Sequence, residues 1–351
     1  MAWFDLKRLV PENKLQKQKT ESPKKKKKKK ISWFGAPKIR ILFMGTPEFA
    51  AVILSGLVEK KYHIVGIITR KDKPVGRKQE VAESAVKKKA LKYHLPIEQP
   101  EKLDREAIEK IKSLKPDLII VAAYGRILPK EILAIPGFGC INVHASLLPK
   151  WRGASPIQNA LLCGATETGV TLMLMDEGMD TGNIVAQKKI AIAPKDTAES
   201  LGIRSAEESR DFLLETLPLW IERAITPLPQ DNAQATLCQL IEREDGHILW
   251  TDEAETIYNR FRALHPWPGI FTFWKKDNEL LRLKLLFVSF QKQSPQVAHP
   301  VGQVFEVGEK VGVQTGEGVI FLEAVQLEGK TDMPIAEFLL GNKEIIGSFL
   351  Q

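Results

Sequence analysis

The chain has 351 residues, which is long enough for two domains of ordinary size, and its 44% hydrophobic and 27% charged residues are typical of a globular protein. It has no apolar run of about eighteen residues or more, so we expect no membrane-spanning segment. The start lacks the apolar stretch of a secretory signal, and its acidic residues argue against a transit peptide. Three scattered cysteines without a CxxC pair suit a reducing compartment and argue against a zinc site. We therefore expect a cytoplasmic protein without a metal.

The net charge of +8 belongs to the N-terminal region. Residues 1–30 hold twelve Lys or Arg, including the run Lys24–Lys30, against three acidic residues, whereas the other 321 residues hold 39 basic and 40 acidic ones. A run of like charges repels itself, so we expect residues 1–36 to be a disordered, Lys-rich extension. Two interpretations stay open for it: an attraction to RNA phosphates, or an inert solvated extension.

The first ordered elements alternate between strand and helix. A largely apolar run at 38–44 predicts a buried strand, and Thr46-Pro47-Glu48 is typical of a helix start, because Thr caps well, Pro fits the first turn and Glu suits the helix dipole. This helix, to about residue 60, leads to a second apolar strand at 63–69. Strand, helix and strand predict a right-handed βαβ unit in a doubly wound, mostly parallel sheet.

The same alternation continues to about residue 224. Further strands are predicted at 117–121, 139–144 and 170–175, and further helices are predicted up to Tyr93, over 106–114 and over 207–224. Pro218 is expected to kink or split the last helix. A polar loop is predicted between residues 70 and 78. The sequence thus predicts an α/β domain over 37–224.

Beyond residue 224 the pattern changes. A Pro-rich, polar stretch predicts a linker over 225–242. One helix is predicted at about 254–264, followed by strands at 271–274, 281–290, 302–307, 311–315 and 319–326. The alternation Leu-Arg-Leu-Lys-Leu at 281–285 and the Gly-rich turns indicate a small β-barrel over 243–351.

Polar side chains lie at the carboxyl ends of two predicted strands. Asn142 and His144 are two residues apart, so they face the same way at the edge where open α/β sheets bind ligands. Asp180 follows the strand at 170–175 in the turn DEGMDTG, where Gly178 and Gly182 would let the chain turn and aim Asp180 inward. A structural His and a solvated acidic turn are the alternatives.

Ser146, Leu147, Leu148 and Pro149 come directly after this strand. They would form one wall of an apolar pocket for a flat aromatic ligand, or they would only pack the loop. The dinucleotide fingerprint GxGxxG is missing, because Gly45 stands alone after the first strand, and this counts against NAD. The six His residues are dispersed and predict no metal site.

Six segments then identify a resemblance. They are FMGTPEFA, DKPVGR, AAYGRILP, INVHASLLPKWRGASPIQNALL, ETGVTLMLMDEGMDTGNI and HPWPG. In order and spacing they resemble the methionyl-tRNA formyltransferase family over roughly residues 38–345. The resemblance implies a Rossmann-like formyltransferase domain followed by an OB-like barrel that contacts tRNA. It also implies transfer of the formyl group of 10-formyltetrahydrofolate to the amine of initiator methionyl-tRNA.

The same resemblance implies roles for particular residues. Asn142, His144 and Asp180 match the family's catalytic trio, and Ser146–Pro149 matches the loop against which the folate lies. The loop after the second strand would enter the tRNA acceptor stem, with Arg77 at its key basic position. The expected partners are initiator methionyl-tRNA and tetrahydrofolate, and the expected state is a monomer.

The chain also departs from the family. Lys78-Gln79-Glu80 and Glu83-Ser84-Ala85 stand where relatives usually carry Gly-Lys-Lys and Pro-x-Pro, so positive charge is lost from the loop. Two alternative functions remain: a formyltransferase of the same fold acting on a sugar nucleotide or on glycinamide ribonucleotide, and an inactive RNA-binding or folate-binding module. The DKPVGR loop and the barrel favour tRNA, and the intact trio disfavours a pure binder.

Overall fold

The first strand, β1 (Arg40–Gly45), sends its side chains alternately into two cores. The computed structural model describes residues 39–75, 80–293 and 299–351. In it, Ile41 and Phe43 belong to one buried cluster, and Leu42 and Met44 belong to the other. Because side chains alternate along a strand, an apolar strand of this kind needs cover on both faces of its sheet. The predicted buried strand is confirmed.

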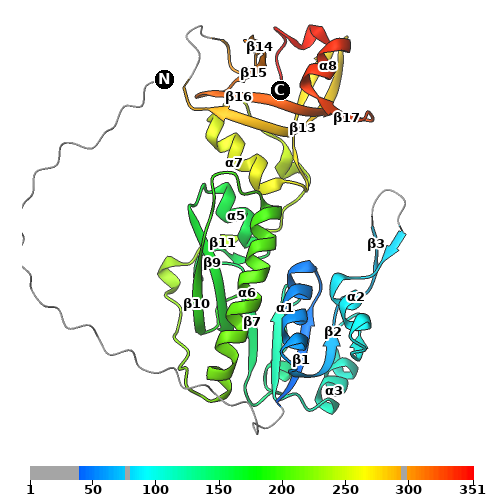
Figure 1. The fold of residues 1–351 in the computed structure, drawn as a ribbon, viewed down its shortest axis with the longest axis vertical. Coiled ribbons are helices and arrows are strands. Elements are labelled where there is room, and N and C mark those ends of the chain that lie inside the picture. Colours follow the sequence, from blue (N-terminus) through cyan, green and yellow to red (C-terminus); the bar gives the residue numbers. More distant parts are fainter. Residues whose placement is uncertain (1–38, 76–79, 294–298) are drawn as a thin grey trace, which may run out of the picture. The chain divides into compact units, whose positions relative to one another are not determined.

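Seven strands form the sheet, in the order β10-β9-β7-β6-β1-β2-β5 (Figure 1). Their bounds are β2 His63–Ile68, β5 Ile97–Glu98, β6 Leu118–Ala122, β7 Cys140–His144, β9 Glu167–Leu174 and β10 Ile184–Ala191. Strands β5, β2, β1, β6 and β7 pair in parallel, whereas β9 and β10 pair antiparallel. The mostly parallel sheet is confirmed, with an antiparallel edge that the sequence pattern did not reveal.

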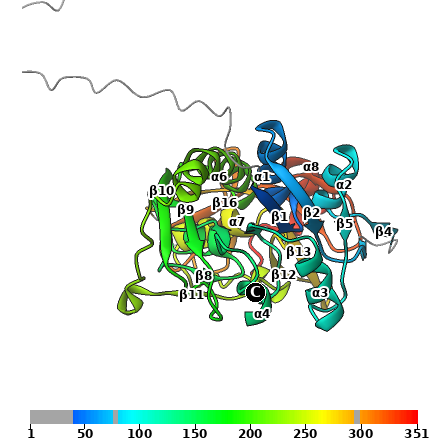
Figure 2. The same ribbon diagram turned by 90° about the horizontal axis from the view of Figure 1, so that it is seen from below.

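Helices cover both faces of this sheet (Figure 2). On one face lie α1 (Glu48–Glu59), α2 (Ala85–Lys92) and α6 (Ala198–Ile221), and α1 contacts both of the others. On the opposite face lie α3 (Arg105–Ser113) and α4 (Lys130–Leu133), whose Ile111 and Ile132 enter the second core. The short α5 (Pro156–Leu162) was not predicted. This layering is the doubly wound arrangement that the sequence predicts.

Helix α6 begins nine residues before its predicted start at 207. Thr197 caps it: the Thr197 hydroxyl accepts from the Ser200 N–H at 3.2 Å, and the Ser200 hydroxyl accepts from the Thr197 N–H at 3.0 Å. Because Ser replaces the usual Glu or Gln of this capping motif, the start was not recognised. Pro218 lies in the last turn and does not split the helix, which continues to Ile221.

The predicted loop at 70–78 contains part of a hairpin, β3 (Lys73–Val75) with β4 (Glu80–Ala82). Its base is fixed at Asp72, which accepts a hydrogen bond of 2.9 Å from the Gln99 amide and pairs with Lys87. Arg77 and the extension 1–36 lie outside the described residues.

The C-terminal part begins with α7 (Ala254–Leu264) and continues as a six-stranded antiparallel sheet. Its strands are β12 Ile270–Lys276, β13 Glu279–Gln291, β14 Val304–Val307, β15 Lys310–Gln314, β16 Val319–Leu327 and β17 Asp332–Pro334. Bridges from Leu350 to Trp274 and from Phe349 to Gln303 bring the C-terminal residues beside both ends of the sheet. This curled sheet agrees with the predicted OB-like domain. Helix α8 (Ile335–Gly341), which was not predicted, follows β17.

Lys38–Gln351 forms one compact unit, so the limits of the two predicted domains and of the linker between them stay predictions. Within the described residues, no helix has both the length and the apolar character needed to cross a membrane.

Candidate active site

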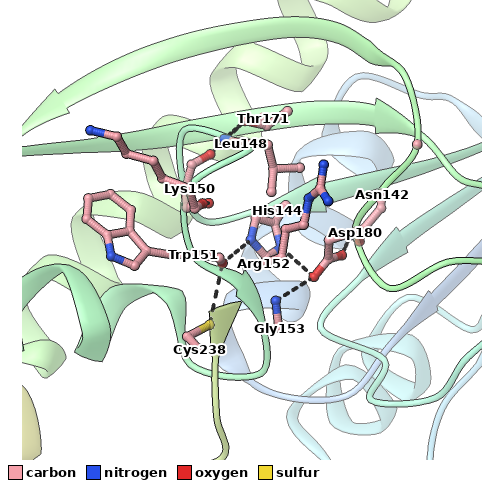
Figure 3. A network of polar contacts seen from close by, with 12 residues as sticks. Asn142, His144, Leu148, Lys150, Trp151, Arg152, Gly153, Thr171, Asp180 and Cys238 are labelled. Atoms are coloured by element: carbon pink, nitrogen blue, oxygen red, sulfur yellow. Dashed lines mark hydrogen bonds and ion pairs between the residues drawn. The ribbon is translucent and has the colours of Figure 1, made fainter. Parts of the chain in front are cut away.

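Asn142 and His144 lie at the carboxyl end of β7, and their side chains point to the same side (Figure 3). The His144 side chain is almost wholly buried. Its Nε2 lies 3.1 Å from the Trp151 carbonyl oxygen, and its Nδ1 lies 3.7 Å from Asp180 Oδ2. Because a carbonyl oxygen can only accept, Nε2 carries a hydrogen in this arrangement. The imidazole is therefore fixed with its Nδ1 edge toward the carboxylate.

Asp180 is brought to this edge by a turn after β9, with a backbone φ of +55°. Its Oδ1 accepts a hydrogen bond of 3.3 Å from Asn142 Nδ2, and its Oδ2 accepts one of 2.8 Å from the Gly153 N–H. Trp151 also has a positive φ, +58°. Left-handed backbone at such residues costs about 1–3 kcal/mol each and persists only where surrounding contacts hold it. The structure thus brings Asn142, His144 and Asp180 together.

The loop Ser146–Pro149 is held by hydrogen bonds to residues outside it. Ser146 and Leu148 are buried, and the Ser146 hydroxyl donates to the Lys150 carbonyl at 2.7 Å. The Leu148 N–H donates to Thr171 Oγ1 at 3.0 Å, and the Leu148 carbonyl accepts from Gln187 Nε2 at 2.7 Å. These contacts fit the loop-packing alternative for Ser146 and Leu148. Contact of the four residues with a folate stays a prediction.

The site offers hydrogen-bond donors and a carboxylate, and its nearest thiol is unsuited to attack. Cys238 Sγ lies 3.4 Å from the Trp151 carbonyl, and burial, with a smaller contribution from the charge of Asp180, raises the pKa of this thiol. A buried thiol of this kind is inert as a nucleophile. Among the described residues, no three or more His, Cys, Asp or Glu side chains gather as they would around a metal ion. The arrangement fits an acyl transfer in which the nucleophile comes from the substrate.

Comparison with known proteins shows the family to which this chain belongs. Residues 37–217 match the family described as formyl transferase, and residues 240–343 match the formyl transferase C-terminal domain. The methionyl-tRNA formyltransferase of Caldicellulosiruptor saccharolyticus is 44% identical over 314 residues, which cover 88% of this chain and 99% of that protein. The enzyme of the same name from Geobacter sulfurreducens is 39% identical, with 86% and 94% covered. The chain belongs to the methionyl-tRNA formyltransferase family.

Solved structures share the fold of this formyltransferase at lower identity. HypX from Aquifex aeolicus in complex with tetrahydrofolic acid is 18% identical, has a TM-score of 0.59, and matches over 87% of this chain and 47% of its own. The N-formyltransferase from Helicobacter canadensis with folinic acid and dTDP-3-aminofucose is 19% identical, has a TM-score of 0.60, and matches over 81% and 99%. At such identities the likeness supports the fold only.

Sequence reasoning missed residues that hold the formyltransferase site in place. Arg152 is buried in the short strand β8 (Arg152–Gly153), which pairs with β11 (Leu237–Cys238) from the predicted linker. Gln230, from the same linker, donates to the Asp180 carbonyl at 2.8 Å. A polar, Pro-rich stretch carries no local signal for such contacts, because its partners are distant in the chain.

Proposed function

We propose that this protein transfers the formyl group of 10-formyltetrahydrofolate to the α-amino group of initiator methionyl-tRNA, giving N-formylmethionyl-tRNA. The observation that carries the proposal is the convergence of Asn142, His144 and Asp180 at the edge of the sheet. It occurs in a chain that aligns over almost the full length of relatives named methionyl-tRNA formyltransferase.

The first half of the reaction forms a bond between the amine nitrogen and the formyl carbon, so that the formyl oxygen becomes negative. An amide nitrogen carries two hydrogens, and Asn142 can therefore donate to Asp180 and to this oxygen at once. His144 becomes a second donor when its Nε2–H exchanges the Trp151 carbonyl for this oxygen. In other acyl-transfer enzymes, removal of one such donor costs about 3–4 kcal/mol. No covalent intermediate with the protein is required, because the neutral amine is itself a nucleophile.

The second half breaks the bond between the formyl carbon and the folate nitrogen. The attacking amine must lose one proton and the leaving nitrogen must gain one. Asp180 fixes the orientation of the imidazole and, together with His144, carries this proton. The separation of 3.7 Å between His144 Nδ1 and Asp180 Oδ2 leaves the two groups close enough for this exchange, directly or through one water.

Both substrates bind at the sheet edge that carries Asn142. We propose that Ser146–Pro149 contacts the folate and that Arg77 contacts the acceptor stem of the tRNA. The support for Arg77 is its position in the sequence between β3 and β4, two paired strands that follow β2. Because β2 and β7 point the same way in the sheet, the hairpin starts from the edge that carries Asn142. We further propose a monomer acting in the cytoplasm.

A formylation assay tests the proposal. The purified protein is given 10-formyltetrahydrofolate and charged initiator methionyl-tRNA, with uncharged tRNA and an amino-sugar nucleotide as comparison acceptors. Formyl-methionyl-tRNA is the expected product. Transfer to the sugar nucleotide alone would keep the site but overturn the acceptor, and transfer to no acceptor would favour a binding protein.

A further inference from the structure

The 228–238 segment, which the sequence assigns to a linker, contacts the catalytic loops at three places along its length. Leu228 exchanges backbone hydrogen bonds of 2.7 and 2.8 Å with Ile184, just after the turn that carries Asp180. The Thr236 carbonyl accepts from the Arg152 N–H at 2.9 Å, and the Thr236 hydroxyl accepts from the Trp151 N–H at 2.8 Å. Between these ends lies Gln230.

The Gln230 side chain uses its full hydrogen-bonding capacity on two catalytic loops. Its amide nitrogen donates to the Asp180 carbonyl at 2.8 Å and to the Gly182 carbonyl at 2.7 Å. Its amide oxygen accepts from Arg152 Nε at 3.1 Å and from Arg152 Nη2 at 2.8 Å. Two donors and two accepted bonds are all that a glutamine side chain offers.

Arg152 connects this glutamine to the carboxylate of Asp180. Its buried guanidinium is held by the neutral oxygens of Gln230 and of Asn232, the latter at 2.8 Å from Nη2. The next residue is Gly153, whose N–H donates to Asp180 Oδ2. Gln230 therefore links the backbone of the Asp180 turn to the strand that binds the Asp180 side chain.

We propose that Gln230 is a positioning residue for formyl transfer, which sets Asp180 in its left-handed conformation beside His144. The inference rests on the proposed function and extends it to a residue that does not face the reacting atoms. Its physical reason is the cost of the positive φ at Asp180, which the two carbonyl contacts offset. Displacement of a catalytic group by about 1 Å lowers rates by about a hundredfold.

The test compares Gln230→Met with Gln234→Met by steady-state kinetics. Methionine keeps the length of the side chain and removes its hydrogen bonds. Gln234 lies in the same segment but is exposed, and among the described residues its side chain donates only to Asp231, at 2.8 Å, which makes it a matched control. We expect Gln230→Met to lower kcat between about tenfold and a hundredfold. The KM for both substrates should stay near that of the control, whereas the melting temperature should fall, because the buried Arg152 guanidinium loses its Gln230 acceptor.

Gln230→Glu tests the hydrogen bonds of the amide nitrogen separately from those of the amide oxygen. It keeps an acceptor for Arg152 but faces the Asp180 and Gly182 carbonyls with oxygen in place of N–H donors. We expect it to lose kcat as Gln230→Met does. Recovery of the parent kcat in Gln230→Glu would show that only Arg152 needs the glutamine, and would overturn the proposal.

Backbone hydrogen exchange gives a readout that needs no activity. In Gln230→Met, amides of residues 180–183 and of Gly153 should exchange faster than in Gln234→Met. An unchanged kcat, or a fall of kcat that is matched by an equal loss of substrate affinity, would overturn the positioning role. If the parent protein formylates no acceptor, the proposed function fails, and exchange rates equal to the control would then reject Gln230 as the residue that sets the turn.

Discussion

The Asn142 amide nitrogen, to which we assign donation to the formyl oxygen, lies 3.3 Å from an Asp180 carboxylate oxygen. We expect Asn142→Ala to lower kcat about a hundredfold or more, because the developing negative oxygen loses one donor. Asn142→Asp, which has the same shape, should be worse still, since it replaces the donor by a charge that repels Asp180. Single-turnover formylation, with tRNA binding measured alongside, checks both. An Asp variant more active than the Ala variant would contradict this role.

Gly153 combines a backbone φ of +122° with a close neighbour: a Cβ there would stand 2.2 Å from the Cys238 carbonyl oxygen. Gly153→Ala should therefore separate β8 from β11 and remove the N–H donor from Asp180. We expect a loss of stability of at least about 1 kcal/mol together with reduced kcat. Gly137→Ala is the control, because a Cβ at Gly137 meets no atom within 4 Å. Equal melting temperatures for the two variants would refute the expectation.

The individual site residues differ in how far the sequence reveals them. Asn142 and His144 are visible from the two-residue period of a strand, whereas Asp180 needs a turn whose direction depends on distant contacts. Gln230 contacts the Asp180 carbonyl across 50 positions of the chain, and Arg152 contacts Gln230 across 78. Such pairs leave no local pattern, so the sequence could not predict them.

At the scale of elements, the apolar strands and both ends of helices α1, α3 and α7 were predictable, because burial fixes their pattern. Strand β10 was missed, since its two buried residues, Val185 and Ile190, are separated by Ala186 and the polar run Gln187-Lys188-Lys189. The direction of β9, which runs antiparallel to both of its neighbours β7 and β10, has no counterpart in the sequence pattern. In its sequence, an edge strand with one solvated face resembles a polar loop.

Helix α6 starts beside Asp196, whose side chain is buried and pairs with Arg204. Hydrogen bonds from Arg204, and further ones from the Ala193 N–H and Ser200, outweigh the effect of burial and lower the pKa of the Asp196 carboxyl below its ordinary 3.8. A carboxyl with a lowered folded pKa adds stability above its unfolded pKa and loses it as pH falls through the folded one.

We therefore expect Asp196→Asn to be clearly less stable than the parent at neutral pH, and this difference to shrink as pH falls below about 3.8. Urea unfolding at about pH 7 and about pH 3 measures it. Glu199→Gln, at an exposed position of the same helix turn, should show little difference at either pH. A stability difference for Asp196→Asn that stays constant between the two pH values would exclude the carboxylate as its cause.

On the scale of the whole molecule, the excess positive charge and the candidate catalytic residues lie in different parts of the sequence. Residues 1–30 carry a net +9, whereas the other 321 residues carry a net −1. The segment that we assign to tRNA carries the uncharged Gln79 and the acidic Glu80 directly after Arg77 and Lys78. A protein that must attract a polyanion with a neutral body therefore gains from a cationic extension, because each phosphate it neutralises releases counterions.

Deletion of residues 1–30 should raise the KM for tRNA and flatten its dependence on salt, while kcat and the KM for the folate stay unchanged. Each phosphate contact that is lost should reduce the slope of log affinity against log salt by about 0.9. A full-length variant with Lys24–Lys30 replaced by glutamine separates charge from chain length, and it should behave like the deletion. If both variants keep the parent KM for tRNA at low and at high salt, the extension is inert, and the attraction must come from the hairpin and the C-terminal sheet.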